Sequence, residues 1–369
     1  MMKKILLGST LLMSVASFSA ANAGEPLKLG ISGFYHAALG FTADSKYSEG
    51  DGRRNANLKQ NTEVHFSGQF TMDIGVTAGV KFELEGQTKG DQIDATYAYL
   101  KSGLGEVRIG NFGSAAGLLC GGLSTASDAL PVAGAMNFSN LGRDGLQLVN
   151  SDSTDVCNTI NDKGTKIAYF SPSFGGFRVA TSYMIDDTED DASNFPDGSA
   201  GGLNGGNSGD SREWSLGATY DVTIGSFGVS AYAGWEKAFD AETNQGSGKA
   251  SYYQFGGAVT FGNLSLGMGY QQGFNLGSAH TLDSKTFGLT GTWKMDAFKF
   301  GFTWLRAWYD LDGVSKKDTH DVYMITTSYA LGTGVTLDGA VTHDVYKAKI
   351  AGNDNYKSYT FQFGMTIGF

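Results

Sequence analysis

The chain has 369 residues, including 54 Gly, 24 Phe, 17 Tyr and only 4 Pro, and its formal charge at pH 7 is −10. Gly costs about 1 kcal/mol in a helix interior, so this composition excludes a helical protein. The many aromatic residues exclude a disordered chain, and collagen would need far more Pro. The acidic balance argues against a nucleic-acid partner, because phosphates bind through an excess of Lys and Arg. An ordered β-protein remains.

Residues 1–23 have the features of a cleaved signal peptide. Lys3 and Lys4 form a positive start, residues 5–18 are an apolar stretch, and the segment ends in Ala-Asn-Ala, the small residues that a cleavage site requires. The apolar stretch is shorter than the roughly 20 residues of a membrane-spanning helix. We therefore expect an exported protein with one domain over residues 24–369 and a formal charge of −12.

Along the rest of the chain, apolar residues recur at every second position, which is the period of β-strands rather than helices. Even the uncharged stretch 250–282 follows this period, because Gly, Gln, Ser and Thr separate its apolar residues. The pattern predicts about sixteen strands. In chain order the runs lie at 27–41, 64–72, 80–84, 93–99, 107–109, 167–169, 177–183, 214–222, 227–235, 253–261, 264–270, 287–293, 298–304, 323–329, 335–341 and 359–369.

The connections between these runs alternate in length. Tight turns are expected at 103–105, 172–176, 225–226, 262–263, 296–297 and 332–334. Longer polar connections are expected at 42–60, 113–163, 186–212, 238–249, 275–284, 312–318 and 347–356. Short turns at one end and long loops at the other are typical of a transmembrane antiparallel β-barrel of the outer membrane.

A soluble β-sandwich or propeller is the alternative all-β fold. In nearly every predicted strand, however, the face opposite the large apolar residues carries Gly, Ser, Thr, Gln and charged residues. Such a face lines water rather than a core. Lipid on one side of a sheet and water on the other require a closed barrel, because open edges in hydrocarbon leave backbone groups unpaired.

Three segments and the chain end resemble the Gram-negative general porin family, particularly its alphaproteobacterial branch. They are YAYL at 97–100, EVRIGN at 106–111, YFSPSFGGF at 169–177 and the terminal Phe369. The resemblance implies a sixteen-stranded homotrimer in the outer membrane of a Gram-negative bacterium, in contact with lipid and lipopolysaccharide. It also implies that the long third loop folds into the lumen, and that Phe369 is part of the signal read by the barrel assembly machinery.

The segment 113–163 fits that inward loop, because it is the longest connection and follows the fifth predicted strand. It is far more apolar than a solvated loop, which predicts that part of it packs against the inner wall. Four carboxylates would then be available to face the aperture, and a solvated or capping role is the alternative for each. They are Asp128, Asp144, Asp152 and Asp155.

Cys120 and Cys157 lie in the same segment. Export leads to an oxidising compartment, in which the two can form a disulfide and stabilise the loop by about 3 to 4 kcal/mol. Two unpaired thiols are the alternative. A metal site is disfavoured, because no His cluster nearby would complete a ligand set.

Parity along the strands assigns charged residues to the lumen face, nine acidic and five basic. They are Glu63, Lys81, Glu83, Glu85, Asp94, Glu106, Arg108, Lys166, Arg178, Glu213, Glu236, Lys294, Asp338 and Asp344. The family resemblance implies a field between a basic wall and an acidic loop, with Lys81, Arg108 and Lys166 as the basic candidates. Glu83 and Glu85 share that wall, so it is not purely basic. The acidic excess predicts mild cation selectivity in a channel for ions and small hydrophilic solutes.

Enzyme motifs are not found around the five His residues, so we expect no catalysis and no cofactor. His36 and His65 are expected to face the lumen as polar wall residues. The acidic run at 186–191 offers oxygen ligands for loosely bound Ca²⁺ or Mg²⁺, although a solvated loop is the simpler interpretation.

Two further points stay open at the level of sequence. An adhesin or structural barrel with a plugged lumen is the alternative function. Arg306 is aligned with Trp304 and Trp308 on the lipid side, where an Arg is costly. We expect it to reach lipopolysaccharide phosphates or to lie at a subunit interface.

Overall fold

The computed structural model describes most of the chain. The described residues are 25–44, 56–86, 92–121, 123, 125–127, 130, 156–160, 163–186, 212–239, 250–276, 282–350 and 355–369. The predicted signal peptide lies outside them, as do Asp128, Asp144, Asp152, Asp155 and residues 187–191 of the acidic run.

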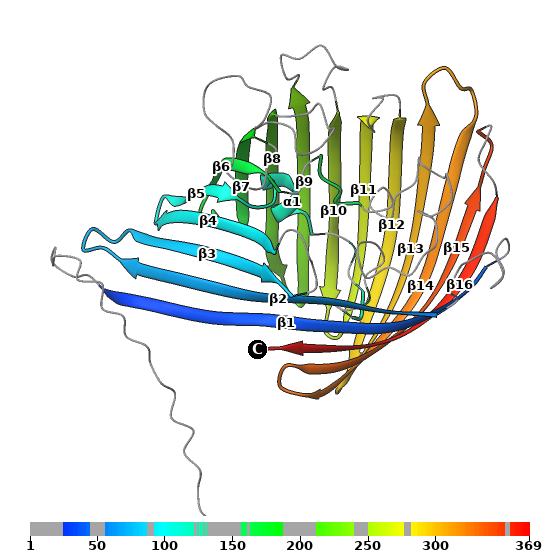
Figure 1. Cartoon of the computed structure of the whole chain (residues 1–369), viewed down its shortest axis with the longest axis horizontal. Helices are drawn as coiled ribbons and strands as arrows, with labels where there is room; N and C mark the ends of the chain where they lie inside the picture. The colour runs from blue at the N-terminus through cyan, green and yellow to red at the C-terminus, as the bar shows by residue number, and fades with distance from the viewer. Residues whose placement is uncertain are drawn as a thin grey trace, which may run out of the picture.

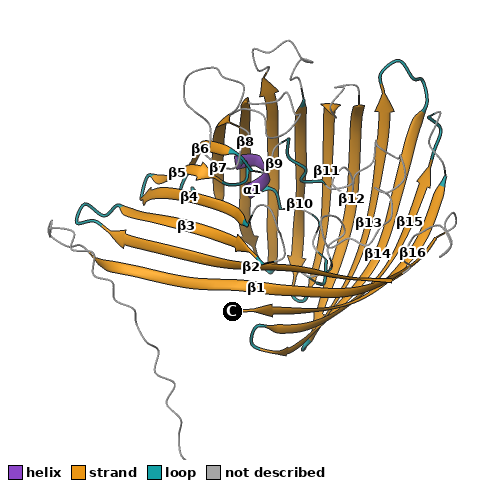
Figure 2. Cartoon of the chain, in the orientation of Figure 1, coloured by secondary structure: helices purple, strands orange, loops and turns teal. Residues whose placement is uncertain are grey.

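Within these ranges sixteen antiparallel strands form one closed barrel, as the alternating pattern predicted (Figures 1 and 2). The strands are β1 (Glu25–Asp44), β2 (Ala56–Thr71), β3 (Thr77–Glu85), β4 (Ile93–Ser102), β5 (Gly105–Asn111), β6 (Thr165–Phe170), β7 (Phe177–Asp186), β8 (Arg212–Ile224), β9 (Phe227–Phe239), β10 (Ser251–Phe261), β11 (Leu264–Leu276), β12 (Leu282–Met295), β13 (Phe298–Leu311), β14 (Lys317–Gly332), β15 (Val335–Lys347) and β16 (Tyr356–Gly368). Each strand pairs with its neighbour in sequence, and β1 pairs with β16.

The last residues of the chain close the barrel. In the ladder between β1 and β16, Phe34 lies opposite Gly368, and Phe41 lies opposite Phe361. Beyond the last strand residue, the N–H of Phe369 donates to the carbonyl of Gly33 at 3.0 Å and the N–H of Gly33 donates back at 2.9 Å. Phe369 therefore completes the backbone pairing at the seam, which Figure 1 shows where the C-terminus lies beside β1.

The two faces of the wall differ as the sequence predicted. On β12, Leu289 and Trp293 point outward and are exposed, whereas Thr286 and Thr290 point inward and are buried. The same alternation continues through β16, where Phe361 and Phe363 are exposed. Alternation of this kind follows from the two-residue period of a strand, so one face is apolar and the other polar.

The connections also alternate, with some differences from the sequence-based boundaries. The six predicted tight turns are present, and a seventh at 72–76 joins β2 to β3. The strand β3 ends at Glu85 and β4 begins at Ile93, and β1 and β2 extend into the connection expected at 42–60. The two-residue turns at 225–226 and 262–263 place Gly225 (φ 61°) and Gly262 (φ 53°) in the left-handed region, where Gly is favoured.

A short helix, α1 (Ala115–Leu119), follows β5. No helix in the described ranges is both long and apolar enough to cross a membrane.

An ion pair on the outward face lies among aromatic rings. Arg306 on β13 donates from Nε and a terminal nitrogen to the two carboxylate oxygens of Asp321 on β14, at 2.6 and 2.8 Å. The rings of Trp304 and Trp308 flank the guanidinium, 5.8 and 5.9 Å from their centres. The Asp321 side chain is only 4% exposed. The two partners expected for Arg306 from sequence did not include this carboxylate, which the register of β13 and β14 places directly opposite.

We predict that Arg306→Leu destabilises the barrel by about 2 to 4 kcal/mol, because the Asp321 carboxylate loses its ion-pair partner on the apolar face and keeps only the long hydrogen bond from Trp304 Nε1 at 3.4 Å. The double variant Arg306→Leu/Asp321→Leu should recover most of the loss, because no charge remains there. Urea unfolding in lipid vesicles measures both.

The matched control for this pair is Lys317→Leu. Lys317 pairs with Asp310 across the same two strands, but both side chains are well exposed, so its removal should cost less than about 1 kcal/mol. Equal losses for Arg306→Leu and Lys317→Leu would contradict the account of the outward pair.

Candidate functional site

The inward face of the wall is lined by small and polar side chains. Hydroxyl and amide groups recur on it from strand to strand, and many are covered by other parts of the chain. Examples are Ser182, Ser215, Gln254, Gln271, Thr286, Thr290, Thr303, Thr326, Thr342, Ser358, Thr360 and Gln362. A face of this composition binds water or the backbone of a segment laid against it.

Helix α1 is fixed to this face through its first turn. Ser114 is its N-cap and accepts a hydrogen bond from the N–H of Gly117 at 3.1 Å. The N–H of Ala115 donates to the hydroxyl of Ser182 on β7 at 3.0 Å, and the N–H of Ala116 donates to Ser215 on β8 at 2.8 Å. The first N–H groups of a helix have no partner within the helix. The wall hydroxyls supply those partners, and Figure 2 shows α1 beside β8 and β9.

Glu236 on β9 connects the two limbs of segment 113–163. One of its carboxylate oxygens accepts a hydrogen bond from the hydroxyl of Ser114, at the start of the segment. The other accepts one from the N–H of Ile160 at 2.9 Å, near its end. Glu236 is fully buried, and a buried carboxylate requires hydrogen-bond donors. The sequence placed Glu236 on the lumen face but did not identify it as an anchor.

The returning limb has two further attachments. The amide nitrogens of Gln254 on β10 and Gln271 on β11 both donate to the carbonyl of Asn158, at 2.5 and 2.6 Å. Cys120 and Cys157 form a disulfide, which confirms the predicted pairing and joins the two limbs covalently.

Other described residues of the segment contact strands further around the wall. Leu123 packs so closely on Gly288 of β12 that a Cβ there would collide with it. The N–H of Ala126 donates to Thr326 of β14 at 2.8 Å. Leu130 is completely buried and reaches Gly364 of β16. These contacts all fall on the inward face, and they place successive parts of the segment along the wall from β7 to β16.

The charged wall residues on β3 and β5 form local ion pairs. Lys81 pairs with Glu83, and Arg108 pairs with Glu106. Arg108 also lies over the ring of Tyr97, 4.9 Å from its centre. In each pair the two residues lie two apart on one strand, so they share the inward face as parity predicted.

Two other candidates have different surroundings. Lys166 on β6 is 1% exposed and donates to the carbonyl of Phe112, so its charge lies beneath the segment rather than in contact with the open lumen. Glu85 lies opposite Glu63 on β2, which adds a second carboxylate to that part of the wall. Lys163, at the end of the segment, pairs with Asp94 at 2.8 Å.

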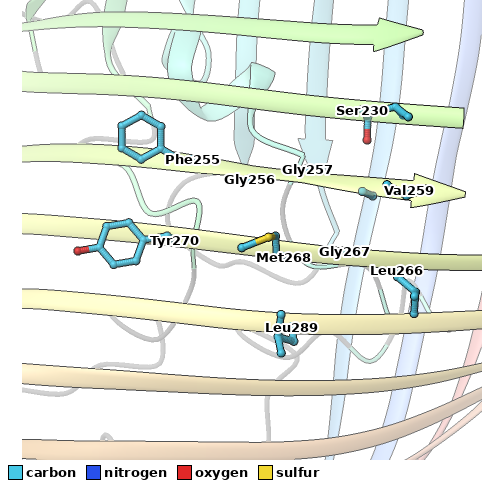
Figure 3. Close-up of a pocket in the computed structure, with 12 residues that line it drawn as sticks. Ser230, Phe255, Gly256, Gly257, Val259, Leu266, Gly267, Met268, Tyr270 and Leu289 are labelled. Atoms are coloured by element: carbon cyan, nitrogen blue, oxygen red, sulfur yellow. The ribbon is translucent and has the colours of Figure 1, made fainter. Parts of the chain in front are cut away.

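A groove of about 560 Å³ lies elsewhere, on the outward face of β9 to β12 (Figure 3). The side chains of Phe255, Val259, Leu266 and Met268 surround it, and Gly257 leaves the gap between them. Its lining is apolar and faces away from the lumen. It is therefore not part of a path for polar solutes.

A family model described as Gram-negative porin matches residues 8–349. No curated protein matches the chain. Among solved structures, OmpT of Vibrio cholerae in a trimer form is 14% identical over 93% of this chain and 99% of its own, with a TM-score of 0.60.

Two further structures cover 93% of this chain and 100% of their own. An anion-selective porin from Comamonas acidovorans is 14% identical with a TM-score of 0.60. A porin refined at 1.8 Å resolution is 18% identical with a TM-score of 0.58. At this identity the structures show a shared fold, whereas the family model covers most of the sequence. The chain belongs to the Gram-negative porin family and is a channel-forming barrel of the outer membrane.

Proposed function

We propose that this porin is a diffusion channel for ions and small hydrophilic solutes, narrowed by segment 113–163. The observation that carries the proposal is the attachment of both limbs of the segment to the inward wall through Glu236. A segment held there occupies part of the cross-section, so solutes must pass between it and the opposite wall. No covalent step is needed, because such a channel controls passage through its width and its electrostatic potential.

We further propose mild cation selectivity. Nine acidic residues against five basic ones were assigned to the lumen face, and eight against four remain when the buried Glu236 and Lys166 are left out. A narrow opening with low-dielectric walls magnifies this excess. The preference is weak because Lys81 and Arg108 hold positive charge beside Glu83 and Glu106. The same fold occurs in an anion-selective porin, so the sign depends on wall and loop charges rather than on the barrel.

A homotrimer is proposed from the family and from the trimer form of OmpT. Lipid and lipopolysaccharide would surround it, and Phe369 would serve as part of the assembly signal as well as the seam. No cofactor is proposed for diffusion. The plugged adhesin or structural barrel is the competing function, and it differs in carrying no current.

In planar bilayers, the purified protein should therefore produce stepwise conductance. The conductance steps should occur in groups of three if each trimer inserts into the bilayer as one unit with three lumens. A protein that inserts without conducting would contradict the channel and support the plugged barrel.

We predict that Glu236→Ala gives larger and noisier single-channel currents, because both limbs of segment 113–163 lose a shared anchor. The matched control is Asp338→Ala, which removes an inward carboxylate that accepts hydrogen bonds from Thr336 and Thr366 of the wall itself. If both variants conduct like wild type, Glu236 does not hold the segment in the current path.

Reversal potentials under a KCl gradient should show a small preference for K⁺. The double variant Glu83→Lys/Glu85→Lys should shift the potential toward chloride, because it converts two negative charges on the wall into positive ones. A wild-type channel that prefers chloride would show that the acidic excess does not face the path.

A further inference from the structure

Three metal-ligating side chains meet on the inward face of β2 and β3. Glu63 and His65 lie two residues apart on β2, and Glu83 lies directly opposite His65 on β3. His65 Nε2 and Glu63 Oε2 are 2.8 Å apart. One nitrogen or oxygen from each of the three side chains lies within 4.8 Å of the other two.

The surroundings of this cluster favour a defined arrangement of the three groups. The side chains of His65 and Glu63 are 21% and 15% exposed, and that of Glu83 is 16% exposed. Each of these three side chains is thus mostly covered by the wall and partly accessible from the lumen. The ring of Phe34 on β1 packs edge-on against the His65 ring, with 6.1 Å between centres. The strand register and this contact hold the imidazole beside the carboxylates.

The donor set indicates the class of cation. Imidazole nitrogen suits zinc and other first-row divalent metals, whereas carboxylate oxygen alone suits Ca²⁺ or Mg²⁺. One imidazole with two carboxylates leaves at least one position for lumen water, as in zinc sites with three protein ligands. Two carboxylates and a neutral imidazole also balance the charge of a divalent cation.

We propose that Glu63, His65 and Glu83 form a binding site on the lumen wall for a divalent cation of the zinc class. Lys81 competes for this site, because its ammonium pairs with Glu83. The binding reaction therefore includes displacement of Lys81 from that carboxylate.

Calorimetric titration of the purified full-length protein with ZnCl₂ tests the site directly. We expect one Zn²⁺ per chain, and loss of affinity by more than about tenfold in His65→Gln and in Glu63→Gln, since even outer-shell changes cost that much. CaCl₂ should bind far more weakly. An absence of Zn²⁺ binding to the wild-type protein would overturn the proposal.

The matched control is Glu85→Gln, which removes a charge from the same wall outside the ligand set. It should keep Zn²⁺ affinity within about threefold, the size expected of a general change in potential. Equal losses of Zn²⁺ affinity in Glu85→Gln and Glu63→Gln would show that the negative potential of the wall, rather than this ligand set, attracts Zn²⁺. That result would overturn the assignment. If the His65 and Glu63 variants fail to fold, the variant Lys81→Met tests the site instead. It should bind Zn²⁺ more tightly than wild type, because Glu83 is released from its ion pair. Unchanged or weaker Zn²⁺ binding would overturn the site.

The effect on current rests on the proposed function, whereas the binding does not. In conducting bilayers, Zn²⁺ should reduce the wild-type current more than the His65→Gln current, because a bound ion opposes the passage of other cations. A protein that binds Zn²⁺ but carries no current would overturn the channel and keep the site. A conducting protein that binds no Zn²⁺ would overturn the site and keep the channel.

Discussion

Backbone hydrogen bonding in hydrocarbon is the constraint on which the whole structure depends. Every N–H and C=O in the membrane must be paired within the protein, so a sheet that crosses lipid must close on itself. Here the closure is made by β1 and β16, with Gly33 and Phe369 adding the last pair of hydrogen bonds. Once the sheet is closed, the two-residue period of its strands places one face against lipid and the other around a lumen.

The same constraint explains how the lumen is modified. A closed wall has no free backbone donors or acceptors to hold another segment, so its inward side chains must do so. Hydroxyls of Ser182 and Ser215, amides of Gln254 and Gln271, and the carboxylate of Glu236 perform this role. Inward glycines such as Gly288 leave the space into which the segment packs. The wall composition is thus matched to the segment as well as to water.

The alternation of residues predicted the sixteen strands, and the short connections between the runs predicted six of the tight turns, because both depend on local sequence. Export to an oxidising compartment predicted the disulfide. Contacts between distant residues were harder to predict. Arg306 conflicted with its apolar neighbours until the register placed Asp321 opposite it on the same outward face. Glu236 was recognised only as a lumen charge, because its two partners are 122 and 76 residues away in sequence. Lys166 was correctly assigned to the inward face, but its burial was not predicted, because it depends on the position of the Phe112 carbonyl.

The central claim is that segment 113–163 narrows a water-filled lumen. Swelling of proteoliposomes in sugars of increasing size tests it directly, using wild type and a variant in which residues 122–155 are replaced by a short Gly-Ser linker that retains Cys120 and Cys157. The account predicts that the shortened variant admits larger sugars than wild type, with the barrel still folded by its circular dichroism. The same size limit in both proteins would contradict it.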